Sequence, residues 1–155
     1  MFKHILVAID GSSYSKEALP AGVEMAKKFD GEILVFHASE HDRGRAVVYT
    51  VETPAAATAL VADAVKKLQD AGVAAKGQLV DVAAGHVAKA IVETAEANGI
   101  DLIVMGSRGL SDVQGMMLGS VTHKVMQMAV IPVLVVRTAI AKPATPNGAV
   151  ASLTH

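Results

Sequence analysis

Glycines cluster in the segment from Val104 to Val125, which reads VMGSRGLSDVQGMMLGSVTHKV. Glycine inside a strand or helix costs roughly 0.5–1 kcal/mol relative to alanine, so such a cluster needs a physical reason. Either the backbone adopts left-handed dihedral angles there, or another group approaches it closely. Gly106-Ser107-Arg108-Gly109 follows an apolar run, and Gly119-Ser120 precedes a helix-like pattern. Backbone N–H groups and a positive helix end would then face one point, which predicts a site for an anion such as phosphate.

Side chains near these glycines suit the same chemistry. Arg108 carries a fixed positive charge that can contact two phosphate oxygens at once, and Ser120 and Thr122 carry hydroxyl donors. The G-x-x-x-x-G-K-[ST] phosphate loop and the G-x-G-x-x-G dinucleotide fingerprint are both absent from the sequence. A plain turn followed by a helix cap therefore remains an alternative interpretation of the glycines alone.

The elements that must position these residues are short apolar runs separated by helical patterns. Runs that do not alternate and are bounded by Gly, Asp or Pro predict buried parallel strands at His4–Ile9, Glu32–Ala38, Asp101–Gly106 and Ile131–Arg137. A weaker, alternating run at 74–82 predicts an edge strand. The segment 39–52 between the second strand and the next helix is expected to be a long loop.

Helix signals fill the intervals between the strands. Serines cap the expected helix at 13–29, and Gly31 follows its end. Thr53 and Pro54 mark the start of the second helix and Gly72 its end, while the third ends at Asn98-Gly99. Pro20 should kink the first helix or delay its start.

This alternation predicts an α/β fold, an open doubly wound five-stranded parallel sheet with helices on both faces. In such a sheet the ligand binds beyond the carboxyl ends of the strands, at the point where the strand order reverses. Asp10-Gly11-Ser12 and His37-Ala38 follow two of the strands, so they should reach the same edge as the glycine cluster. We expect one domain over residues 1–138 and a flexible tail over 139–155, which is rich in Ala, Pro, Thr and Gly.

Composition narrows the function classes. The 155 residues include no cysteine, which excludes disulfides, thiolate metal sites and cysteine nucleophiles. Fourteen basic and fifteen acidic residues give a net charge of −1, which does not favour nucleic acid as a partner. The chain starts without a secretory leader, and its apolar runs fall short of the ~18–20 residues of a membrane span. We therefore expect a cytoplasmic protein without membrane insertion.

The spacing of the glycines adds a family resemblance. Gly106, Gly109, Gly119 and Ser120 meet the pattern G-x-x-G, nine residues, G-[S/T]. Together with ILVAIDGS, EILVFHA, AIVETAEANGIDLIVMGSRG, LGSVTHKV and IPVLVVR, this pattern resembles the universal stress protein family from Met1 to about Arg137. The resemblance implies the strand order 3-2-1-4-5, ATP as the ligand, and a homodimer. That strand order places the ends of the first and fourth strands side by side.

The resemblance also implies roles for single residues. The nucleoside pocket would be lined by Ala8 and Ile9, and the backbone of Ala38 would face the adenine edge. Asp10 would contact the ribose or a Mg²⁺ ion that accompanies the ATP phosphates. The residues implied to frame the ribose and phosphates are Met105, Gly106, Arg108 and Gly109, and those implied to hold the β- and γ-phosphates are Gly119, Ser120, Val121 and Thr122.

Other interpretations of the polar residues stay open at this stage. Asp10 could simply help to cap the first helix. A zinc site at His37 and His41 is less favoured than solvated or hydrogen-bonded histidines, because one ends a strand and the other lies in the expected loop. His123 is expected to be an exposed helical histidine. No general base beyond Asp10 is evident, so fast phosphoryl transfer is not expected.

The leading hypothesis is an ATP-binding regulatory module whose nucleotide occupancy sets the surface shown to an unknown protein partner. A nucleotide-free dimeric interaction protein and a slow ATPase are the alternatives. The last strand should lie at a sheet edge, where unpaired N–H and C=O groups favour antiparallel pairing with the same strand of a second copy. The residues of that dimer edge are Val133, Leu134, Val135 and Val136.

Overall fold

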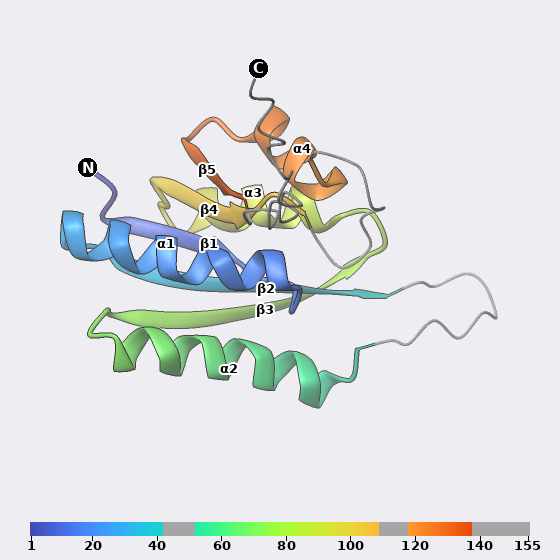
Figure 1. Ribbon diagram of the computed structural model, residues 1–155. Coiled ribbons are helices and arrows are strands. Elements are labelled where there is room, and N and C mark those ends of the chain that lie inside the picture. The colour runs from blue at the N-terminus through green and yellow to red at the C-terminus, as the bar shows by residue number, and fades with distance from the viewer. Residues whose placement is uncertain (42–51, 109–117, 138–155) are drawn as a thin grey trace, which may run out of the picture.

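The computed structural model describes residues 1–41, 52–108 and 118–137. These ranges form a five-stranded parallel sheet in the order β3-β2-β1-β4-β5, with helices on both faces, as expected from the sequence (Figure 1). Gly109 and the expected tail at 139–155 lie outside the described residues. In chain order the elements are β1 (His4–Ala8), α1 (Ser13–Phe29), β2 (Glu32–His41), α2 (Pro54–Asp70), β3 (Ala75–Ala83), α3 (Val87–Ala97), β4 (Leu102–Gly106), α4 (Ser120–Met128) and β5 (Val133–Val136).

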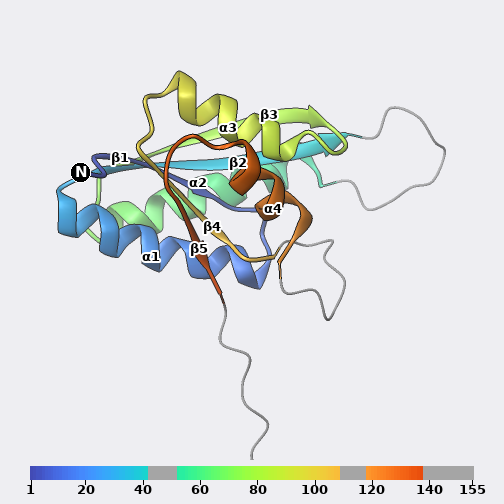
Figure 2. The same ribbon diagram turned by 90° about the horizontal axis from the view of Figure 1, so that it is seen from above.

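Two apolar cores, one on each face of the sheet, hold the layers together. Side chains of alternate strand residues such as Val7 and Val35 pack against α1 and α2. Their neighbours Leu6 and Phe36 pack against α3 and α4 on the opposite face (Figures 1 and 2). Because both faces are covered, the buried stretches of the central strands, Ile5–Ala8 and Ile33–Phe36 among them, are apolar at every position, which is why their sequences do not alternate.

The helix starts follow the sequence signals. Ser12 caps α1 by accepting a hydrogen bond from the Ser15 N–H at 3.1 Å, and Thr53 caps α2 by accepting one from the Ala56 N–H at 3.2 Å. Pro54 occupies the first turn of α2, where its missing N–H costs nothing. Helix α1 begins at Ser13 and contains Pro20, so the proline does not delay its start.

The end of α1 agrees with the sequence prediction, because the helix ends at Phe29 and Gly31 follows its end. The left-handed residue at this end is Asp30, with φ of 51°. A Cβ atom on Gly31 would lie 2.6 Å from the carbonyl oxygen of Phe2, so glycine at this position allows the chain to pass close to the segment before β1. The glycine therefore serves packing, and the aspartate makes the turn.

Strand β2 is longer than predicted, because residues 39–41 belong to the sheet instead of a loop. They pair with residues 81–83 of β3. Backbone hydrogen bonds of a ladder do not require apolar side chains, so a polar stretch continues a strand wherever a neighbouring strand runs beside it. The rest of the expected loop, residues 42–51, lies outside the described residues.

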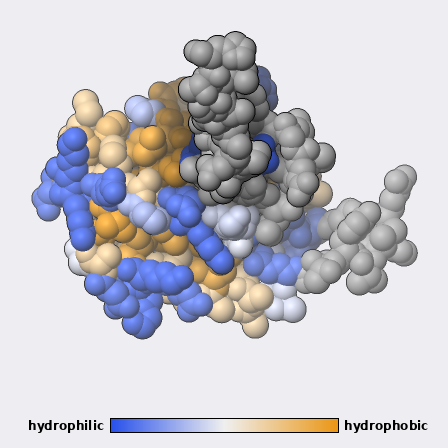
Figure 3. Space-filling view, viewed as in Figure 1, coloured by the Kyte–Doolittle hydropathy of each residue, from blue (hydrophilic) through white to orange (hydrophobic). Residues whose placement is uncertain are grey.

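The outer surfaces of α1 and α2 mix hydrophilic and hydrophobic residues, as Figure 3 shows for one face of the molecule. Such mixing is ordinary for helices that cover one face of a sheet. Across the described ranges, each helix is too short or too polar to cross a membrane.

Candidate functional site

The strand order reverses between β1 and β4, which lie side by side with Ala8 opposite Met105. The connection after β1 runs through α1 on one face of the sheet, and the connection after β4 runs through α4 on the other face. The segments that follow the two strands therefore diverge, and this is where ligands bind in open α/β sheets. The predicted residues around Asp10, Ala38, Gly106 and Gly119 all belong to this edge.

Two short hydrogen bonds fix the start of α4 against the end of β4, and a third joins the end of β4 to β5. The Gly119 N–H donates to the Ser107 carbonyl at 2.7 Å, and the Thr122 hydroxyl donates to the Gly106 carbonyl at 2.9 Å. The Ser107 N–H donates to the Val136 carbonyl at 2.8 Å, which ties the same point to β5. The sequence analysis expected Gly106 and Gly119 to lie close together. The structure confirms this, because each glycine takes part in one hydrogen bond between the end of β4 and the start of α4.

Gly119 is the N-cap of α4, and its backbone is ordinary, with φ of −70° and ψ of 154°. The left-handed conformation considered for the glycine cluster is therefore wrong at this position, whereas the helix-cap alternative is confirmed for Gly119, since glycine is a common N-cap residue. Close approach of a ligand to Gly119 stays a prediction. Without a side chain, Gly119 cannot cap the first turn of α4 as Ser12 and Thr53 cap their helices. The N–H groups of this turn and the positive end of the helix dipole are directed outward, as an anion site requires.

Asp10 shapes the turn from β1 into α1. Its Oδ1 atom accepts a hydrogen bond from the Ser12 N–H at 2.9 Å, and its own N–H donates to the Ser15 hydroxyl at 3.2 Å. Gly11 between them has φ of 82°, which an L residue rarely adopts. The capping role weighed for Asp10 is confirmed, and its contact with a ligand stays a prediction.

The backbone of Ala38 faces the space beyond β1. The Glu32 N–H donates to the Lys3 carbonyl, and the Phe36 carbonyl accepts from the Ile9 N–H at 2.9 Å. The even-numbered residues of β2 therefore direct their backbone N–H and C=O groups toward β1. The β1–β2 register ends at Ala8 and Phe36. By the two-residue period of a strand, the N–H and C=O of Ala38 point the same way, past the end of β1. This is one donor beside one acceptor, the complement of the N1 and amino groups of adenine.

The other predicted residues at this edge differ in how far their side chains are exposed to solvent. Val121 is partly buried and packs against the core that α3 and α4 form. Ser120 is exposed, and Arg108 is partly buried just beyond β4. Three predicted pocket residues are buried, namely Ala8, Ile9 and Met105.

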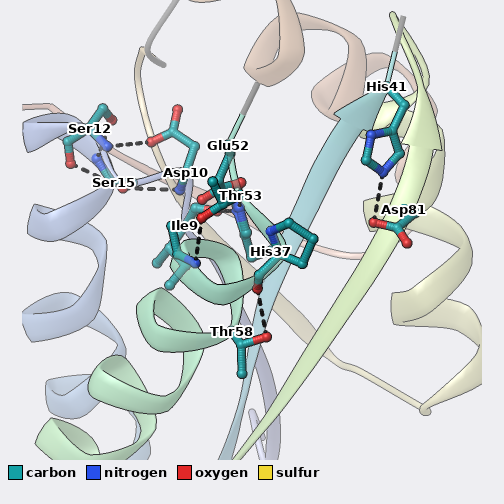
Figure 4. A network of polar contacts seen from close by, with 12 residues as sticks. Ile9, Asp10, Ser12, Ser15, His37, His41, Glu52, Thr53, Thr58 and Asp81 are labelled. Atoms are coloured by element: carbon teal, nitrogen blue, oxygen red, sulfur yellow. Dashed lines mark hydrogen bonds and ion pairs between the residues drawn. The ribbon is translucent and has the colours of Figure 1, made fainter. Parts of the chain in front are cut away.

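Sequence reasoning missed the partners of His37. This side chain is buried, with Nδ1 2.8 Å from the Ile9 carbonyl oxygen and Nε2 2.7 Å from Oε2 of Glu52. Figure 4 draws these residues among their neighbours. The hydrogen-bonded state weighed for His37 is confirmed, and the parts of the chain that the structure describes contain no cluster of three or more metal-ligating side chains. The sequence offered one indication of this contact. Glu52 directly precedes the Thr53-Pro54 helix start, and a helix that follows β2 begins at the same end of the sheet as His37.

Comparisons with known proteins agree with this fold. The model of the universal stress protein family matches residues 1–137. The universal stress protein YxiE of Bacillus subtilis is 36% identical over 156 residues, covering 88% of this chain and 100% of the relative. Among solved structures, hypothetical protein MJ0577 of Methanocaldococcus jannaschii superposes with a TM-score of 0.72 at 27% identity, covering 89% of this chain and 97% of that one. A universal stress protein in complex with cAMP gives a TM-score of 0.69 at 25% identity, covering 89% and 99%.

Proposed function

The chain belongs to the universal stress protein family, and we propose that it is a regulatory module that binds ATP at the carboxyl edge of β1 and β4. A family member of similar structure that was solved with cAMP supports a nucleotide as the ligand. In the proposed complex, nucleotide occupancy sets the surface that the module presents to a protein partner.

The observation that carries this proposal is the first turn of α4. Its N-cap residue, Gly119, makes no side-chain cap, and two hydrogen bonds hold the turn against the end of β4. A fixed set of N–H groups at a helix start is a ready site for phosphate, because no reorganisation is needed when the anion arrives. Arg108, which follows β4, adds the charge that favours a triphosphate over a neutral nucleoside.

The base and ribose would lie on the other side of the crevice. The Ala38 backbone faces the space beyond β1 and would pair with the adenine edge. Ala8 and Met105 are buried apolar residues on the α3 and α4 face at this end of the sheet, and Ile9 is buried on the α1 and α2 face. In the proposed complex they would give the base apolar surroundings. The proposal therefore places base, ribose and phosphates in order from β2 across β1 to β4 and α4.

The donor set fits a Mg²⁺ ion that arrives with ATP. Mg²⁺ on nucleotides is usually held by phosphate oxygens, water and one or two carboxylates. Asp10 supplies one carboxylate at the end of β1, and its Oδ1 atom already accepts the Ser12 N–H. In the proposed complex, Asp10 would contact the ion or the ribose while it keeps this turn.

We also propose a homodimer formed through β5. This strand lies at the edge of the sheet with β4 as its neighbour, and its four residues are each partly buried. An apolar edge strand with unpaired backbone groups invites pairing with a second strand. Antiparallel pairing of Val133, Leu134, Val135 and Val136 with the same residues of a second copy would complete the edge under two-fold symmetry.

Release of nucleotide from freshly purified, heat-denatured protein tests the proposed ligand. Mass spectrometry of the supernatant should find ATP, or ADP if hydrolysis is slow, in a near-stoichiometric amount. The Gly119→Val variant, purified in parallel, is the control and should release little. If the wild-type protein releases no nucleotide and calorimetry detects no ATP binding, the nucleotide-free interaction protein becomes the better account.

A further inference from the structure

The imidazole of His37 occupies the place where the ladder between β1 and β2 would continue. The last bond of the observed ladder runs from the Ile9 N–H to the Phe36 carbonyl. In the same register, the next bond would run from the Ala38 N–H to the Ile9 carbonyl. That carbonyl instead accepts from Nδ1 of His37 at 2.8 Å. The pairing of the two strands thus stops at the residue where the proposed base site begins, and the imidazole of His37 lies on the Ile9 carbonyl at that point.

Glu52 fixes the orientation of the histidine ring. A carbonyl oxygen only accepts, so Nδ1 donates its hydrogen to Ile9, and Nε2 lies 2.7 Å from the Glu52 carboxyl group. Both ring nitrogens of this side chain, which is only 4% exposed, therefore have partners.

We propose that His37 and Glu52 are positioning residues that make the site selective for the adenine edge. They hold the Ile9 carbonyl, stop the β1–β2 ladder one bond early, and keep the N–H and C=O of Ala38 available to a base that offers an acceptor beside an amino group. Without the imidazole, the Ala38 N–H would bond to Ile9 and the polar edge for the base would close. This inference rests on the proposed function, since it concerns the same site.

The exchange rate of the Ala38 amide hydrogen in ligand-free protein tests the ladder directly. NMR should show faster exchange at Ala38 than at Phe36, whose N–H lies within the ladder, and the ring of His37 should carry its hydrogen at Nδ1. In His37→Leu, which places an apolar side chain on the apolar face shared with Ile33 and Val35, exchange at Ala38 should slow toward that of Phe36. Unchanged exchange in this variant would overturn the proposal.

Base selectivity is measured with ATP and with purine riboside triphosphate, its analogue without the 6-amino group. The wild-type protein should bind ATP about tenfold more tightly than the analogue, the effect of roughly one hydrogen bond. In His37→Leu this ratio should fall close to one while both affinities decrease. A variant that keeps the wild-type ratio would overturn the role of His37 in selectivity.

A matched set of variants separates positioning from a general structural effect. Glu52→Gln can donate its amide N–H to Nε2 of a neutral ring and should keep the wild-type ratio, whereas Glu52→Ala should lower it. His41→Leu is the control, because His41 lies on the same strand and contacts Asp81 at 3.1 Å in an exposed pair. It should change neither the ratio nor Ala38 exchange, and a change as large as that in His37→Leu would contradict the proposal.

These readouts distinguish the inference from the proposed function. If wild-type protein binds neither triphosphate, the proposed function fails, and Ala38 exchange still reports whether His37 ends the ladder. If ATP binds but the ratio is the same in wild type and His37→Leu, the proposed function stands and this inference fails.

Discussion

Replacing Thr122 by valine tests whether its hydroxyl holds the site together or binds phosphate directly. The Thr122 hydroxyl donates to the Gly106 carbonyl at 2.9 Å, and the residue is 2% exposed. Valine has nearly the same shape but no hydroxyl, so the carbonyl would lose this donor in a place that water cannot easily reach. Loss of such a buried bond costs about 1–3 kcal/mol.

Urea denaturation of wild type, Thr122→Val and Thr122→Ser measures this cost. The valine variant should unfold at a lower urea concentration with an unchanged m value, because the surface exposed on unfolding is the same. For a domain of this size, each kcal/mol corresponds to a decrease in Tm of roughly 3–4 °C. Serine keeps the hydroxyl and should recover most of the loss.

Nucleotide binding gives the second half of the same test. A hydroxyl has one hydrogen, and Thr122 already donates it to Gly106. Thr122→Val should therefore weaken ATP and adenosine by similar factors, through the looser connection between β4 and α4. An unchanged unfolding midpoint, or a loss confined to ATP, would refute this reasoning and favour direct contact of the hydroxyl with phosphate.

Three further substitutions test other parts of the proposal. Arg108→Ala should weaken ATP roughly 10- to 150-fold, the value of a charge-assisted hydrogen bond, and adenosine hardly at all; equal losses in calorimetry would place the guanidinium elsewhere. Gly119→Val should abolish ATP binding without loss of the helical circular dichroism signal, because the valine side chain blocks close approach of phosphate to α4. Gly109→Val is expected to act in the same way. An unchanged Kd for ATP would exclude the proposed phosphate site. Val135→Lys should convert a dimer to a monomer in sedimentation experiments at micromolar concentration, whereas a wild-type protein that is monomeric throughout would rule out pairing through β5.

Much of the fold follows from local sequence patterns. Apolar runs that do not alternate predicted the central strands, because a sheet covered on both faces has no polar side. Ser12, Thr53 and Pro54 marked helix starts correctly, since a cap depends on bonds within three or four residues. The strand order was a different matter, because it came from the family resemblance and not from these patterns.

Sequence patterns say less where two distant segments decide a local conformation. Gly31 follows the end of α1 as predicted, but its lack of a side chain is needed beside Phe2, and Asp30 takes the left-handed angles. The polar residues at 39–41 looked like a loop, yet β3 runs beside them and extends the ladder. Hydrogen bonding between strands depends on which backbone lies alongside, and this cannot be inferred from side-chain polarity.

The sequence by itself predicted which residues belong to the candidate site, namely the glycines, Arg108 and Asp10, and the family resemblance added the backbone of Ala38. Only the tertiary structure decided how the described residues are held. In it the Thr122 hydroxyl bonds to the Gly106 carbonyl, His37 contacts Ile9 and Glu52, and the N-cap residue of α4, Gly119, makes no side-chain cap. The physical reason is that residue type and spacing specify donors and acceptors, whereas their partners depend on segments that meet only when the sheet forms.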